Sequence, residues 1–369
     1  MTPAPNKNLN ENTVGNTILS GDMEAYLRSA VQPIASKLDT DSTTLFESFR
    51  ALGEQGWLAP KLPIEMGGLG LSSAEYQQFQ GQLARYSGAL AFLQTQHQSA
   101  ASLLLSSENE ALKQTYLPGM AAGNHQLGVG FSQLRRRPAP MTATAVEGGY
   151  RLTGTFPWVT GAGLFTDFVG AAVLPEGTAV FGIVPLTSQT VDEDCWLAVG
   201  ESMPLAGMAA TRTVEVQLKN WFLASEQVLG MRPVGWLEAR DRANPLSPLG
   251  LIFGCTQAGI DALKVSLKRR GIEHAIAQQL ALKLAWLKMD LPRVAALSGE
   301  AYPQKIALRG RAISLMNTCA QAAMIAASGA ANLASHPTQR IYKESLVFSV
   351  SGQTTDGAVA SLNSLLSSS

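Results

Sequence analysis

The stretch GYRLTG at residues 149–154, followed by WVTG at 158–161, decides how the middle of the chain folds. Its apolar residues form short runs bounded by Gly and Thr, which is typical of β-strands. The pair Gly148-Gly149 at its start is a strong turn signal. Trp158 is either a core aromatic of a strand or a wall for a planar ligand, and its spacing alone leaves both interpretations open.

The spacing of apolar residues changes twice along the 369 residues of the sequence. Residues 21–125 carry apolar side chains at helical spacing, and Ser72 followed by Glu75 is typical of a capping box that starts a helix. Residues 126–230 carry short apolar runs between turn residues, which predicts a small antiparallel β-domain. Residues 231–369 are again helical and rich in Ala and Leu. Helices, strands and helices in separate blocks predict an α+β protein.

The bulk composition limits the class of partner. With 28 basic and 28 acidic residues the formal net charge is zero, which favours neither nucleic acid nor a membrane surface. Residues 1–20 lack the apolar core of a signal peptide, and we expect a disordered tail there. No apolar stretch has transmembrane length. Cys195, Cys255 and Cys319 are distant and show no CxxC spacing, so we expect free thiols and a cytoplasmic protein.

Four segments, in the same order along the chain, resemble motifs of the acyl-CoA dehydrogenase superfamily. Residues 56–71, GWLAPKLPIEMGGLGL, are similar to the family's glycine-rich N-terminal loop. Residues 149–161 are similar to its Y-x-L-x-G-x-K-x-W-I-T/S-N motif, and 207–213, GMAATRT, to G-x-R-x-S-D-T. Residues 337–344, PTQRIYKE, are similar to P-x-E-R-x-x-R-D. The resemblance implies an N-terminal α-helical domain, a middle antiparallel β-domain and a C-terminal four-helix bundle.

The resemblance also implies FAD as the cofactor. In that family the residue at the Trp158 position packs against the flavin ring, and the one at the Thr160 position hydrogen-bonds the ring edge. A planar, electron-poor ring needs such an apolar wall and a few placed donors. The family's T-E-P-x-A-G-S-D stretch is replaced by GFSQLRRR at residues 130–137, and its phosphate-side motifs keep an arginine and small residues. We predict these cofactor-binding residues: Phe131, Ser132, Trp158, Thr160, Arg269 and Gly329.

The chain departs from the family at the catalytic base. Most family dehydrogenases carry a Glu, in a Y-E-G-T segment, that removes the alpha proton of the acyl thioester, and counting forward from Arg340 that position is Gly352. The family's other position for this Glu falls near Leu249, where the sequence has no carboxylate. A general base must reach the proton that it removes. The candidates that remain are His97, an unmatched carboxylate such as Asp356, or the substrate's own acidity.

His97 lies in a predicted helix that in this family runs close to the substrate cavity, and the ordinary pKa of histidine suits acid–base chemistry. The alternative is a helix histidine satisfied by a neighbouring group. The arginines at 135–137 either bind a phosphate of CoA, FAD or a carrier-protein arm, or form a solvated loop. No histidine shows ligand spacing, so we expect no metal site. We predict His97 as the catalytic candidate, and Arg135 and Gly352 at the substrate.

Three functions are compatible with these motifs. The first is an FAD-dependent oxidoreductase of the acyl-CoA dehydrogenase type, acting on an acyl thioester or a similar substrate. The second is a flavin monooxygenase on the same fold, because such members also lack the Glu. The third is a flavin-free binding or scaffold subunit, which the retained WVTG segment at 158–161 argues against. The family places its flavin between subunits, so we expect a homodimer or homotetramer, with an electron-transfer or reductase partner.

Overall fold

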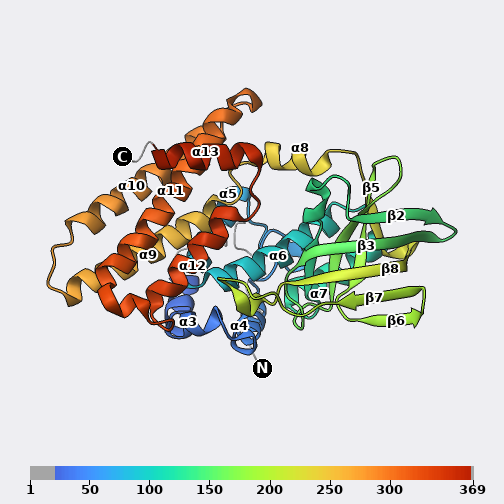
Figure 1. The fold of residues 1–369 in the computed structure, drawn as a ribbon, viewed down its shortest axis with the longest axis horizontal. Coiled ribbons are helices and arrows are strands. Elements are labelled where there is room, and N and C mark those ends of the chain that lie inside the picture. The colour runs from blue at the N-terminus through green and yellow to red at the C-terminus, as the bar shows by residue number, and fades with distance from the viewer. Residues whose placement is uncertain (1–20, 367–369) are drawn as a thin grey trace.

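The computed structural model describes residues 21–366 and shows helices at both ends of the chain with a β-sheet between them (Figure 1). The predicted tail at residues 1–20 lies outside the described residues, as do residues 367–369. The N-terminal helices run in the order α2 (Met23–Tyr26), η2 (Leu27–Val31), η3 (Gln32–Ile34), α3 (Ala35–Leu38), α4 (Ser42–Glu54), η4 (Ile64–Met66), α5 (Ser73–Tyr86), α6 (Gly88–Leu105) and α7 (Glu110–Ala122).

The predicted capping box starts α5. The Ser72 hydroxyl accepts the backbone N–H of Glu75 at 3.3 Å, and the Glu75 carboxylate accepts the backbone N–H of Ser72 at 2.8 Å. These two bonds satisfy two of the donors that every helix start leaves without an intrahelical partner. Helix α5 therefore begins at a residue fixed by its own local sequence.

The middle of the chain forms one nine-stranded sheet, in the spatial order β6-β7-β8-β3-β2-β4-β5-β9 with β1 beside β4. Most neighbours are antiparallel, as expected, but β1 runs parallel to β4 and β2 meets β4 in parallel. Its elements are β1 (Leu127–Gly130), η5 (Ser132–Arg135), β2 (Met141–Val146), β3 (Gly149–Val159), β4 (Asp167–Val173), β5 (Ala179–Pro185), β6 (Gln189–Asp192), β7 (Cys195–Val199), η6 (Ala209–Thr211), β8 (Val214–Ala224), η7 (Ser225–Gln227) and β9 (Val228–Arg232).

The turn predicted at Gly148 joins β2 to β3. The register pairs Val146 with Gly149, and Gly148 has φ +75°. A side chain at Gly149 would place its Cβ 2.2 Å from the carbonyl oxygen of Leu223 in β8. Only glycine therefore permits the close approach of β3 to β8 at this point.

The C-terminal helices pack against α5 and α6, and α6 lies between this bundle and the sheet in Figure 1. Their contact with α5 is close: a Cβ at Gly254 of α9 would lie 2.4 Å from the carbonyl oxygen of Gly81. No helix within residues 21–366 is both long and apolar enough to cross a bilayer. The elements are α8 (Trp236–Ala243), α9 (Leu249–Arg269), α10 (Ala275–Ala295), η8 (Gly299–Ala301), α11 (Tyr302–Ala327), η9 (Ser328–Asn332), α12 (Pro337–Val350) and α13 (Thr355–Leu366).

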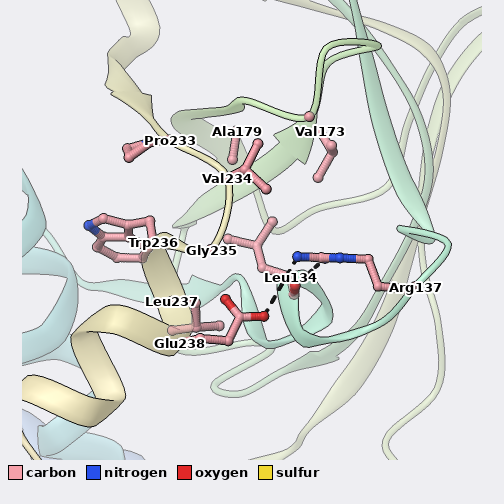
Figure 2. A pocket seen from close by; sticks show the side chains of 11 residues that line it. Leu134, Arg137, Val173, Ala179, Pro233, Val234, Gly235, Trp236, Leu237 and Glu238 are labelled. Carbon is pink, nitrogen blue, oxygen red and sulfur yellow. Dashed lines mark hydrogen bonds and ion pairs between the residues drawn. The ribbon is translucent and has the colours of Figure 1, made fainter.

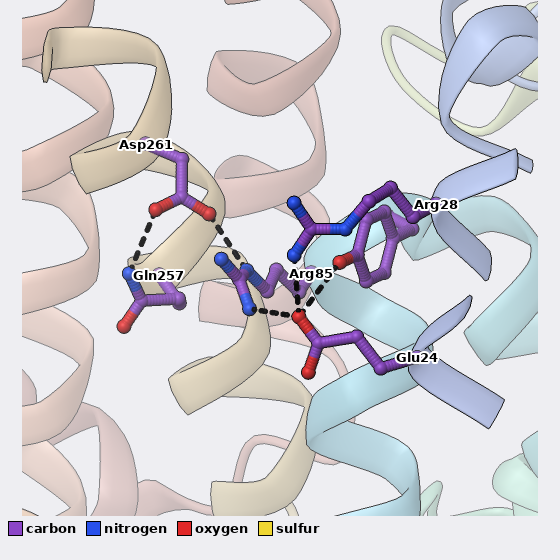
Figure 3. Close-up of polar contacts among 6 residues, drawn as sticks. Glu24, Arg28, Arg85, Gln257 and Asp261 are labelled. Atoms are coloured by element: carbon purple, nitrogen blue, oxygen red, sulfur yellow. Dashed lines mark hydrogen bonds and ion pairs between the residues drawn. The ribbon is translucent and has the colours of Figure 1, made fainter. Parts of the chain in front are cut away.

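Ion pairs join the first helix to the bundle (Figure 3). The Glu24 carboxylate accepts from Arg28 at 2.9 Å, from Arg85 at 3.2 Å and from the Tyr86 hydroxyl at 3.1 Å. Arg85 also donates to Asp261 of α9 at 2.6 Å. Arg85 of α5 thus forms ion pairs with both α2 and α9 and links these two helices.

A fully buried carboxylate links α12 to the start of α6. Glu344 is 0% exposed and takes two bonds from Arg340, at 2.7 and 2.8 Å, and one from the backbone N–H of Gly88 at 2.8 Å. Burial raises the pKa of Glu344, and Arg340 and the Gly88 N–H oppose that rise. A carboxylate at a helix N-terminus is favourable. This contact therefore fixes the start of α6 relative to α12.

Candidate functional site

The ends of β1 and β3 lie side by side and carry the predicted ring-binding residues. A Cβ at Gly130 would lie 3.1 Å from Val159, and η5 packs against β3. Trp158 is 47% exposed, an unusual fraction for so large an aromatic side chain on a central strand. Its exposure excludes the interpretation of Trp158 as a core aromatic. A flat apolar surface is therefore available at the end of β3.

Two buried hydroxyl groups follow the ends of β1 and β3. Thr160 is buried, and its Oγ1 lies 3.0 Å from Oγ1 of Thr213, so the Thr213 hydroxyl orients it. The hydroxyl of Ser132 is buried and has no hydrogen-bond partner among residues 21–366. Buried hydroxyl groups are normally paired, because leaving one unpaired costs about 1–3 kcal/mol. An unpaired buried hydroxyl after β1 and an exposed tryptophan at the adjacent end of β3 fit a site for a polar, planar ligand.

Segment η5 is held by α8 through aromatic and ionic contacts. The ring of Phe131 lies 6.1 Å from Trp236, and both rings lie under the guanidinium of Arg240, at 5.5 and 5.4 Å. Arg135 binds the carboxylate of Asp241 at 2.6 and 3.1 Å. Arg135 is thus not a solvated loop residue, and it lies where α8 meets the β-domain.

A small pocket lies at this joint (Figure 2). Arg137 reaches across it to Glu238 of α8, at 3.6 Å, and Leu134 and Trp236 line its walls. Its volume of about 20 Å³ is enough for a water molecule and no larger ligand. The pocket is a structural joint, and substrate must bind elsewhere.

Gly352, which the sequence resemblance predicts at the position of the family's catalytic Glu, lies in the turn between α12 and α13. Gly352 has φ +60°, and an added Cβ would meet no atom within 4 Å. Arg309 of α11 holds this turn, because its Nη2 donates to the carbonyl of Gly352 at 3.1 Å and lies 3.4 Å from that of Ser351. Leu249, near the family's second base position, is fully buried in the core. The turn at Gly352 is thus held by a buried guanidinium, and the Cβ position of Gly352 meets open space.

His97 lies in the core between α6, α7 and β1. It is 0% exposed, its Nδ1 lies 3.3 Å from the backbone N of Leu127, and its Nε2 lies 3.1 Å from the carbonyl of Met120. One ring nitrogen therefore accepts and the other donates, as in a neutral imidazole. Burial lowers the pKa of His97 to about 4. This is the alternative that the sequence left open, a histidine satisfied by its neighbours, and it argues against an acid–base role.

Arg269 and Gly329 lie away from the other predicted cofactor residues. Arg269 ends α9, and Gly329 follows α11 in η9, at the end of the bundle where Arg270 reaches the carbonyl of Ala326 at 3.5 Å. Both are exposed. Helix α9 has 21 residues and spans about 30 Å, with α8 at its other end. One chain therefore does not bring all six residues to one place.

A groove of about 640 Å³ runs between the start of α11 and α13. Its size suits a small molecule. Tyr302, at its edge, is close enough to Arg309 to influence the pKa of that residue. Asp356, considered from the sequence as a base, lines this groove 4.0 Å from Arg242.

Arg309, Arg240 and Asp241 were not predicted as site residues. One signal was present for Arg309: it lies three residues after Ile306 and four before Ile313, both buried, so a charge stands on the apolar face of a helix. Arg240 and Asp241 give no such signal, because the contacts that gather them are tertiary.

The sheet between two helical regions, with a flat site at its strand ends, defines a class of flavoprotein-like folds. A family model described as "Acyl-CoA dehydrogenase, N-terminal domain" matches residues 17–124. A "3-(aryl)acrylate reductase" of Clostridium sporogenes is 22% identical over 274 residues, which is 72% of this chain and 72% of that protein.

Solved structures agree over nearly the whole chain. A glutaryl-coenzyme A dehydrogenase in complex with glutaryl-CoA superimposes with a TM-score of 0.78 at 18% identity, over 99% of this chain and 96% of that one. KijD3 in complex with FMN and a dTDP-sugar superimposes with a TM-score of 0.75 at 20% identity, over 96% and 94%. The chain thus has the fold of the acyl-CoA dehydrogenases, and residues 17–124 match the model of their N-terminal domain.

Proposed function

We propose that this chain is an FAD-dependent oxidoreductase of the acyl-CoA dehydrogenase type that acts on an acyl thioester or a related substrate. The observations that carry the proposal are the exposed Trp158 at the end of β3 and, just after the neighbouring β1, the buried Ser132 hydroxyl, which has no partner among the described residues. Trp158 would cover one face of the flavin ring, and Thr160 and Ser132 would hydrogen-bond its polar edge. Bound flavin would supply the hydride acceptor.

Position 352 supplies no base in this proposal. Glycine has no titratable group, and the nearest groups that the structure places at this turn are the Arg309 guanidinium and backbone carbonyls. In this proposal the chemistry proceeds without the family's usual carboxylate at position 352. A relative that is named an acrylate reductase supports redox chemistry at a carbon–carbon double bond.

Two neighbouring subunits would complete the flavin site. Phe131, Ser132 and Trp158 lie at the strand ends, whereas Arg269 and Gly329 lie at the far end of the bundle. A homodimer or homotetramer would bring the second group of one subunit to the cofactor of another. We also propose an electron-transfer or reductase partner, and a cytoplasmic location, which three free thiols support.

A monooxygenase on the same fold is the second candidate. Gly352 favours it, because oxygenation needs no removal of an alpha proton. A solved neighbour that holds FMN supports flavin chemistry on this fold beyond acyl-CoA substrates.

One experiment separates the candidates. Flavin-loaded protein is mixed anaerobically with a panel of acyl-CoA thioesters while the oxidised-flavin absorbance is followed. Bleaching by a thioester supports the dehydrogenase type. Product formed only with a reductase and oxygen supports the monooxygenase, and protein that takes up neither FAD nor FMN contradicts both.

A further inference from the structure

Arg135 of η5 pairs with Asp241 of α8, and Arg240 of α8 and Arg309 of α11 lie within electrostatic reach of the same carboxylate. We call Arg135, Arg240 and Arg309 the arginine cluster. Arg135 binds Asp241 at 2.6 Å, and Asp241 also raises the pKa of Arg240 and of Arg309 against the lowering effect of their burial. Arg135 lowers both pKa values further, so the three positive charges act on one another. The cluster carries more positive charge than its carboxylate can balance.

Arg309 is the most deeply buried member. Its residue is 4% exposed, and its Nη2 reaches the carbonyls of Ser351 and Gly352. Its Nε is buried and has no acceptor among residues 21–366. A buried, unpaired donor on a charged group costs more than a neutral one. Arg309 therefore holds the turn through Nη2 while its Nε–H has no acceptor in the described part of the chain.

Arg240 also lacks a charged partner of its own. Its guanidinium lies over the rings of Phe131 and Trp236 and forms no ion pair in the described part of the chain. Stacking of this kind orients a guanidinium and leaves its N–H groups free for an acceptor. The two aromatic rings thus orient the guanidinium of Arg240 and leave its N–H groups available to an acceptor.

Ligand can reach the cluster. The side chains of Arg135 and Asp241 are 30% and 22% exposed. No atom lies within 4 Å of the position that a Cβ would take at Gly352, so the turn next to Arg309 is open. The cluster therefore has an exposed edge at Arg135 and Asp241, and the turn that Arg309 holds is exposed at Gly352.

We propose that the arginine cluster binds an anionic oxygen group of the substrate, a carboxylate or a phosphate, next to Gly352. The inference rests on the proposed function for the identity of the ligand as substrate. A guanidinium pairs with either group through two parallel N–H bonds. Asp241 competes with the ligand for the same arginines, so it sets the affinity as well as the geometry of the cluster.

The test is calorimetric titration of the purified protein, with and without FAD, with acetate and separately with inorganic phosphate at low ionic strength. Saturable 1:1 binding of one of them is expected, and which one binds distinguishes a carboxylate from a phosphate. Arg309→Gln and Arg240→Met are expected to weaken binding at least tenfold. Asp241→Asn is expected to tighten it at least threefold, because a competing charge is removed.

Arg311→Gln is the matched control, since Arg311 lies two residues away on α11, is 55% exposed and pairs with Asp290. It should leave the affinity unchanged. If Arg309→Gln fails to fold, Arg240→Met still decides, because Arg240 forms no ion pair with the described residues that its loss would break.

Absence of saturable binding of either anion, or unchanged affinity in both arginine variants, overturns the inference. Protein that takes up FAD but binds neither anion contradicts this inference alone. Protein that binds an anion through the cluster but takes up no flavin supports the cluster and contradicts the proposed function.

Discussion

Arg309 donates from Nη2 to the carbonyl oxygen of Gly352 across 3.1 Å, at the position that the sequence resemblance predicts for the family's catalytic Glu. The glycine at position 352 carries no titratable group, and the guanidinium that contacts its carbonyl is a group that can bind negative charge. The turn between α12 and α13 is therefore kept in place by a cation. This relationship connects the loss of the base to the arginine cluster.

Restoring the carboxylate should restore proton removal. In Gly352→Glu the new side chain enters open space, at a cost of about 1–2 kcal/mol for a left-handed backbone. A positioned general base contributes about 10²- to 10⁴-fold. We expect saturated acyl-CoA to bleach the flavin of this variant at least about a hundredfold faster than that of the wild type, measured by anaerobic stopped flow.

Gly352→Gln is the control for that change, because it has the same size and backbone strain but no basic group. It should bleach as slowly as the wild type. Wild-type protein that bleaches as fast as Gly352→Glu would show that a base acts from elsewhere.

His97 should make stability depend on pH. Its folded pKa of about 4 lies below its ordinary value of 6.5. The unfolded chain therefore binds a proton first, so the stability is complete above pH 6.5 and declines as pH falls toward 4. The loss between pH 7.5 and pH 5 is about 2 kcal/mol in the free energy of unfolding.

Urea unfolding of the wild type and His97→Gln at these two pH values measures this contribution. The variant is expected to be less stable at pH 7.5 and to lose about 2 kcal/mol less on acidification. An equal loss in both proteins refutes the assignment of a buried neutral imidazole.

Replacing Ser328 with glycine should make the folded protein more stable. It adopts φ +56° and ψ −144°, a backbone conformation that is essentially confined to glycine. Relief of this strain, less the entropy cost of glycine, should make Ser328→Gly more stable by about 1 kcal/mol in urea unfolding. Ser335→Gly is the control: Ser335 is not among the non-glycine residues with positive φ, so the substitution should destabilise. Loss of stability in Ser328→Gly would contradict the strained turn.

Local signals in the sequence were sufficient for much of the fold. The Ser72–Glu75 pair predicted the start of α5, and Gly148 predicted the turn between β2 and β3, because both depend on neighbouring residues. The order of helices, strands and helices followed from changes of periodicity and is confirmed. The family resemblance is confirmed as well.

Features that depend on distant contacts could not be predicted. Strand β6 (Gln189–Asp192) is exposed at every residue and shows no apolar alternation, so only its pairing with β7 defines it. The parallel pairing of β1 with β4 joins two strands between which η5, β2 and β3 lie in the sequence. The arginine cluster also depends on such contacts, since it gathers side chains from η5, α8 and α11.

The central claim is that a flavin binds at the ends of β1 and β3. Its most direct test is a titration of purified protein with FAD, followed by the absorbance and fluorescence of the flavin. We expect saturable binding, at least tenfold weaker in Trp158→Ala and unchanged in Phe222→Ala, an exposed aromatic of neighbouring β8 that is distant from the site. Binding of neither FAD nor FMN, or equal affinity in the wild type and Trp158→Ala, would contradict the claim.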